Sequence, residues 1–168
     1  MSPIIMAAAG TISVALVLYT IGVFWERSAG ELRVPHVILF WAGLACDATG
    51  TTLMSAFASS TGAAGTLSVH AVTGALAFAL MLFHATWATV TLARGDARMR
   101  ASFHRLSIGV WLFWLLPYVY GMLQGIPALA AMGATTSLTI AAAVPLAIGS
   151  VLCVRAAMGR RHASAVTR

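Results

Sequence analysis

Five long apolar segments, separated by short polar connections, dominate this 168-residue chain. Each is long enough to cross the hydrocarbon core of a bilayer as a helix, which takes about 20 residues. The segments run from Pro3 to Trp25, from Pro35 to Phe57, from Ser68 to Ala93, from Phe103 to Leu123 and from Pro127 to Val154. This pattern predicts an all-α integral membrane bundle over residues 1–155, followed by a short, basic and loosely ordered tail over residues 156–168.

Composition and charge agree with a membrane protein. The chain is 60% hydrophobic and only 8% charged, which leaves too little polar surface for a soluble domain. All ten basic residues are arginines, and they lie in the first connection, around the third connection and in the tail, whereas the second and fourth connections carry no charge. The positive-inside rule therefore predicts an external N-terminus and a cytoplasmic C-terminus. The net charge of +6 indicates contact with anionic lipid and not with nucleic acid.

Histidines are the most informative polar residues of the predicted helices. His70 and His84 lie 14 residues apart on the third segment and share a helix face, roughly 21 Å from each other. Small residues between them on that face, Gly74 and Ala77, leave room for a ligand. Imidazoles in this setting suit axial ligation of a flat macrocycle such as haem.

A single acid, Asp47, lies within the predicted spans, and such a residue should face the bundle interior and have a partner there. On its helix it shares one stripe with other polar or small residues: His36, Gly43, Gly50 and Met54. A similar stripe on the fourth segment contains His104, Trp111, Tyr118 and Met122. Two plainer interpretations stay open: His36 and His104 anchor their helix ends at the headgroups, and His84 hydrogen-bonds Asp47.

Several stretches of the chain resemble one family of small bacterial membrane proteins. They are LYTIGVFWE, HVILFWAGLACDATGTTLMS, HAVTGALAFALMLFHATWA and FHRLSIGVWLFWLLPYVYGM, and the resemblance covers about residues 10–125. They are similar to the HsmA-like proteins, which are named for haem sensing at the membrane. The resemblance implies a protein of the bacterial cytoplasmic membrane that captures haem and protects against haem and oxidative stress, with no known catalysed reaction. At matching motif positions it marks five residues: His36, Asp47, His70, His84 and His104.

The resemblance leaves the iron ligands of a single haem b open. The alternatives for the inner half of the bundle are His84 with His104, His84 with His36, and His36 with His104. In the outer half, His70 would need Met54 or Met122. Two strong axial ligands would leave no open position on the iron, which favours sequestration. Three arginines near the cytoplasmic face are candidates for pairing with haem propionates: Arg33, Arg100 and Arg105.

Two other functions use the same residues. A small b-type cytochrome would exchange electrons with quinone through the same histidines. A proton-coupled transporter would use Asp47 and His84 as a relay without a cofactor. The chain has no hydrolase or nucleotide-binding motif, so we predict no catalytic residues. Its five short helices also suit a homo-oligomer.

Overall fold

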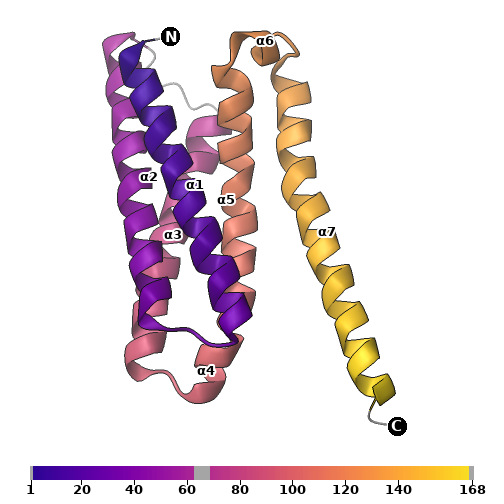
Figure 1. Cartoon of the computed structure of the whole chain (residues 1–168). Coiled ribbons are helices and arrows are strands. Elements are labelled where there is room, and N and C mark those ends of the chain that lie inside the picture. The colour runs from indigo at the N-terminus through magenta and orange to yellow at the C-terminus, as the bar shows by residue number, and fades with distance from the viewer. Residues whose placement is uncertain (1, 63–68, 167–168) are drawn as a thin grey trace. The chain divides into compact units, whose positions relative to one another are not determined.

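The structure, a computed structural model, describes residues 2–62 and 69–166, with side chains as far as Gly159. Within these residues every regular element is a helix (Figure 1). The helices are α1 (Pro3–Ala29), α2 (Val34–Ser60), α3 (Val69–Arg94), α4 (Ala97–Ser102), α5 (His104–Gly125), α6 (Pro127–Ala130) and α7 (Ala134–Val166). Five stretches of the described chain are helical, long and apolar enough to cross a membrane, the fourth formed by α4 and α5 together. The predicted all-α fold with five transmembrane helices is therefore confirmed.

The chain divides into two compact units, residues 1–114 and 115–168, and the boundary falls inside α5. In the first unit α1, α2, α3 and the first half of α5 lie alongside one another, and the short α4 leads from α3 into α5 (Figure 1). The second unit contains the rest of α5 together with α6 and α7. The candidate site described below belongs to the first unit. A single bundle over residues 1–155, with an external N-terminus, stays a prediction.

Short polar contacts fix the ends of the helices in the first unit. Gly30 ends α1 in the left-handed conformation, with a φ of 73° that glycine adopts without strain. Asp96 caps α4 by accepting a hydrogen bond of 2.7 Å from the backbone N–H of Met99. The backbone N–H of Leu32 donates to the carbonyl of Arg100 at 3.1 Å. The connection between α1 and α2 is thereby tied to α4.

Two differences between the predicted and the observed helix boundaries have a clear physical cause. Helix α1 continues past Trp25 to Ala29, because helical hydrogen bonding does not stop where apolar residues stop. The expected fifth segment is interrupted by Gly133, whose φ of 85° ends the short α6 before α7 begins. The start expected for the third segment, Ser68, lies outside the described residues, as does part of the uncharged connection before it.

The expectation of a loosely ordered tail is wrong for the backbone as far as Val166, which is helical. Alanine and arginine are among the residues with the strongest helix propensity, and this segment is rich in both. Intrinsic propensity therefore favours continuation of the α7 helix beyond the apolar stretch.

Glycines allow close contact between α1 and α2. A Cβ atom added at Gly43 would lie 2.5 Å from the ring of Tyr19, and one added at Gly22 would lie 2.7 Å from the ring of Phe40. At Gly50 an added Cβ atom would meet the side chains of Ile12 and Thr11 on α1, and the backbone carbonyl of Ala8. Small residues at helix contacts are the usual means by which membrane helices approach each other. The large rings of Tyr19 and Phe40 fill the space that these glycines leave.

The stripe predicted on the second helix is the buried face of α2. Its polar and small members His36, Gly43, Asp47 and Gly50 are all buried, and Met54 is half-buried. On α3 the predicted face is buried at Ala77 and His84, half-buried at Gly74 and exposed at His70. Helical phase therefore identified the interior face of α2 along most of its length.

The contact at Gly43 generates the first prediction. Gly43→Ala should lower the free energy of unfolding by about 1–3 kcal/mol, because the added methyl group would collide with the Tyr19 ring. Gly10→Ala, on the same pair of helices but with nothing within 4 Å of its added Cβ, should cause no loss. Denaturant unfolding of the detergent-purified variants, followed by helical circular dichroism, measures both. Equal effects of the two substitutions would contradict the close packing described for α1 and α2.

Candidate functional site

Asp47 is buried in the first unit, and its partner is an indole. Trp114 donates a hydrogen bond from Nε1 to Oδ2 of Asp47 at 2.9 Å. The ring of Tyr19 meets Trp114 edge to face, with centroids 5.3 Å apart. The prediction that Asp47 faces the interior and has a partner is therefore confirmed. The alternative in which His84 hydrogen-bonds Asp47 is wrong, because each side chain bonds to a residue of α5 instead.

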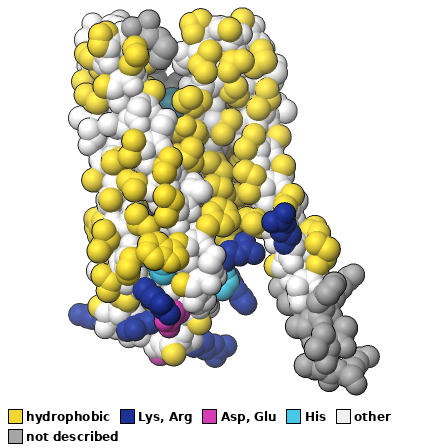
Figure 2. All heavy atoms as spheres, viewed as in Figure 1, with side chains coloured by type: hydrophobic (Ala, Val, Ile, Leu, Met, Phe, Trp, Pro, Cys, Tyr) yellow, Lys and Arg dark blue, Asp and Glu magenta, His cyan; other side chains and the backbone are white. Residues whose placement is uncertain are grey.

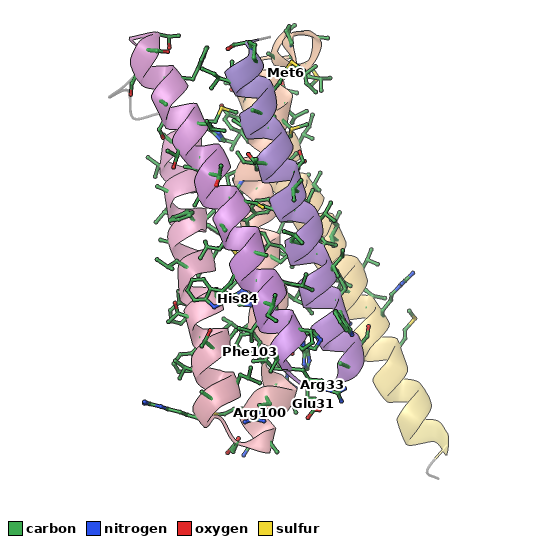
Figure 3. All side chains as sticks on the ribbon, turned by 60° about the vertical axis from the view of Figure 1, so that its left-hand side comes forward. Met6, Glu31, Arg33, His84, Arg100 and Phe103 are labelled. Carbon is green, nitrogen blue, oxygen red and sulfur yellow. The ribbon has the colours of Figure 1, made fainter. Side chains whose placement is uncertain are left out.

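His84 lies in the same interior, nearer the end of the first unit where α1 and α3 finish (Figure 3). Only 1% of its surface is exposed, and it packs against Phe40 and Phe103 at centroid distances of 4.5 and 5.4 Å. Its Nε2 shares a hydrogen bond of 2.9 Å with the hydroxyl of Ser107. Its Nδ1 is buried without a hydrogen-bond partner. Both aromatic contacts and the serine would have to move before this ring could bind an iron.

Glu26 is a buried acid that sequence reasoning missed. Its side chain is fully buried at the end of α1, and neither carboxyl oxygen has a hydrogen-bond partner of good geometry. The hydroxyl of Ser107 and the backbone N–H of His104 approach the carboxyl from the first turn of α5. Through Ser107, the Glu26 carboxyl and the His84 ring are neighbours. The statement that Asp47 is the only acid within a span is therefore wrong.

A signal for Glu26 was present in the helical phase of α1. The buried residues of this helix follow one face, and that face continues in regular steps through Ala15, Tyr19, Gly22 and Val23 to Glu26. The predicted span ended at Trp25, the residue before Glu26, because its boundary was set by hydropathy alone. Extending the phase by one turn would have placed Glu26 inside the bundle.

His36 caps the start of α2. Its Nδ1 accepts a hydrogen bond of 3.0 Å from the backbone N–H of Arg33, and its ring meets Trp25 edge to face at 5.1 Å. Because Nδ1 is the acceptor, the proton of the neutral ring is on Nε2. Ligation of a metal through Nε2 would therefore require the other tautomer and the loss of the cap. The structural role is sufficient to explain this residue.

His104 has the opposite arrangement at the start of α5. Its Nδ1 lies 3.0 Å from the carbonyl oxygen of Ala101, and because a carbonyl can only accept, Nδ1 must donate. The Nε2 of the neutral ring therefore carries a free lone pair. The ring is half-buried and lines an open depression of about 490 Å³ together with Arg98, Ala101, Ser102 and Arg105.

Arginines gather at this end of the first unit, which we call its basic end (Figure 2). It contains Arg27, Arg33, Arg94, Arg98, Arg100 and Arg105. Two of the three arginines expected to pair with propionates have other partners. Arg33 forms a 2.9 Å ion pair with Glu31, and Arg100 donates from Nη2 to the carbonyl of Leu92 at 2.7 Å. The third, Arg105, is exposed at the depression beside His104, as is Arg98.

The structure does not bring the expected pairs of histidines together. No hydrogen bond or ring contact joins His36, His84 and His104 to one another. In the described part of the chain, no three His, Cys, Asp or Glu side chains gather to hold a metal ion. His70 is exposed on the first turn of α3, at the opposite end of that helix from His84. A haem between two core histidines therefore does not fit this arrangement.

Comparisons with known proteins add no further constraint. No family model, no curated protein and no solved structure matches the chain.

The unpaired carboxyl generates the second prediction. Glu26→Met should raise the free energy of unfolding by about 1–3 kcal/mol, because it replaces a buried, unpaired polar group by an apolar one of similar length. The same substitution at exposed Glu31, whose pair with Arg33 is solvated, should cost at most about 1 kcal/mol. Denaturant unfolding in detergent measures both. A Glu26→Met variant less stable than the original would mean that the Ser107 hydroxyl and the His104 N–H already satisfy the carboxyl as hydrogen-bond donors.

Proposed function

We propose that this protein captures haem at the basic end of its first unit, in the cytoplasmic membrane of a bacterium. Haem bound there would be removed from the lipid and from free solution, in line with the protective role that the resemblance to the HsmA-like proteins implies. The observation that carries the proposal is the tautomer of His104. Its Nδ1–H is held by the carbonyl of Ala101, which leaves Nε2 available as an axial ligand.

The hydrogen bond at Nδ1 is of the kind that orients metal-binding histidines. Such histidines almost always donate their second ring N–H to a carbonyl, a carboxylate or water, which fixes the tautomer and increases the basicity of the ligating nitrogen. Of the four candidate histidines, His36 and His84 use a ring nitrogen in a buried contact that ligation would break. His104 needs no rearrangement of its own hydrogen bond to bind iron.

The charges around His104 support an anionic ligand. Arg98 and Arg105 are exposed and line the same depression. Haem is an amphipathic ring with two propionates, and arginine binds carboxylates through two parallel hydrogen bonds. The lining of the depression therefore offers a nitrogen ligand for the iron and two guanidinium groups for the propionates. Bound haem would supply an iron centre with redox and peroxide chemistry.

The residues that line the depression include a single ligating side chain, His104. We therefore expect one axial nitrogen from this chain, in place of the two histidines that a buried sequestration site would use. Capture at the membrane surface then explains the function better than burial between helices. The basic end would face the cytoplasm, as the positive-inside rule predicts.

Haem titration of the purified protein is the third prediction. The protein in detergent or nanodiscs should bind haemin with the absorption spectrum of a five-coordinate, high-spin site. His104→Ala should weaken binding by about tenfold or more. Arg98→Gln combined with Arg105→Gln should weaken it as well, because the propionates lose their partners. His70→Ala, at the other end of α3, is the matched control and should bind haemin normally.

Two results would contradict the proposal. A low-spin spectrum that disappears in His84→Ala but persists in His104→Ala would place the haem in the core. A protein that takes up no haemin, while its helical circular dichroism is normal, would exclude haem as the ligand. An electron-transfer role with quinone would further require that a quinol reduces the bound haem in the same preparation.

A further inference from the structure

Two buried tryptophans on α5 differ in the group to which their indole N–H donates. Trp111 donates from Nε1 to the hydroxyl of Thr20 at 3.1 Å. Trp114, three residues further along, donates to Oδ2 of Asp47 at 2.9 Å. A threonine hydroxyl is a very weak base, whereas a carboxylate accepts a proton readily. Only the second tryptophan therefore has an acceptor for its N–H proton.

This difference matters for one-electron oxidation. An indole that loses an electron becomes a strongly acidic radical cation, so its Nε1 proton moves to a hydrogen-bonded base if one is present. With Asp47 as the carboxylate, oxidation converts a buried pair with one negative charge into a neutral pair. A low-dielectric interior favours that change, because buried charge is costly there. At Trp111 the same oxidation would leave a buried positive charge.

We propose that Trp114 and Asp47 form a one-electron donor site through which the protein reduces strong oxidants. One electron leaves the Trp114 indole for the oxidant, the Nε1 proton moves to Asp47, and a neutral indolyl radical stays on Trp114. The oxidant is the species that peroxide generates at a bound haem. Only this source of the oxidant rests on the proposed function. The donor site itself needs only the contacts among α1, α2 and α5.

The surroundings of Trp114 keep such a radical in place. The side chain is 3% exposed, so water and dissolved reductants have little access. The ring of Tyr19 meets Trp114 edge to face, at 5.3 Å between ring centroids, and the Tyr19 hydroxyl is buried without a hydrogen-bond partner. A phenol reduces a neighbouring radical efficiently only if its own proton can leave. Tyr19 has no acceptor for that proton, so this phenol does not quench the radical on Trp114.

The test begins with the haem-free, full-length protein. Because exposed indoles react first with a dissolved oxidant, the three tryptophans nearest the surface, Trp25, Trp41 and Trp87, are replaced by phenylalanine. A photogenerated one-electron oxidant is applied, and the frozen sample is examined by electron paramagnetic resonance with ring-deuterated tryptophan. We expect a long-lived neutral tryptophan radical. Trp114→Phe should remove most of it, and the matched Trp111→Phe should retain it.

Asp47→Asn separates the proton acceptor from the hydrogen bond. The amide oxygen can still accept from Trp114, but the amide cannot take up the proton, so the radical lifetime should fall by about tenfold or more. Asparagine has nearly the same shape as aspartate, so this variant should fold normally even if the tryptophan variants do not. An unchanged lifetime in Asp47→Asn, or equal signals in Trp111→Phe and Trp114→Phe, would overturn the proposal.

A second arm separates this site from the proposed haem function. The haem-loaded protein is treated with peroxide, and the same Trp114 signal is expected. If the signal appears with the photogenerated oxidant but not with haem and peroxide, the donor site stands and the haem source assigned to its oxidant is wrong. If neither arm yields a Trp114 radical, the donor site is excluded, whether or not haem binds.

Discussion

The close approach of α1 and α2 is the contact on which the interior of the first unit depends. Glycines at positions 22, 43 and 50 let the two helices meet, and the ring of Tyr19 occupies the space at Gly43. That placement presents Tyr19 to Trp114 and turns the face of α2 that carries Asp47 towards α5. A bulkier residue at Gly22 or Gly43 would displace the aromatic rings around the buried polar groups. The arrangement of the buried polar groups therefore depends on the glycines, which have no side chain at the helix contact.

The histidines of this bundle differ in their ability to bind a metal mainly because their ring nitrogens form different hydrogen bonds. His36 accepts at Nδ1 and so holds its proton on Nε2, whereas His104 donates at Nδ1 and leaves Nε2 free. His84 is committed to Ser107 through Nε2. In the sequence these three residues are equivalent candidates. The backbone groups and hydroxyls that distinguish them belong to helix ends and to a neighbouring helix, and a sequence pattern does not specify those partners.

Much of the fold follows from the sequence because hydropathy and length define the spans, and helical phase defines which face of α2 is buried. Helix ends were harder to predict, because a helix can continue for several residues after its apolar residues end. Glu26 was lost for that reason. The partners of the buried groups were not predictable either. Ser107 and Trp114 reach His84 and Asp47 only because of the register of α5 against α2 and α3, which the phase of a single helix does not determine.

The place of Glu26 in α1 has a consequence for assembly. The residue lies one turn before the end of the helix, so α1 can enter the bilayer while this carboxyl still reaches the hydrated headgroups. Ser107 and His104 belong to the first turn of α5, which is synthesised much later. The Glu26 carboxyl therefore gains these two neighbours only once α5 is in place. Helices α1 and α2 can pair before that, because their close contacts at Gly22, Gly43 and Gly50 do not involve Glu26.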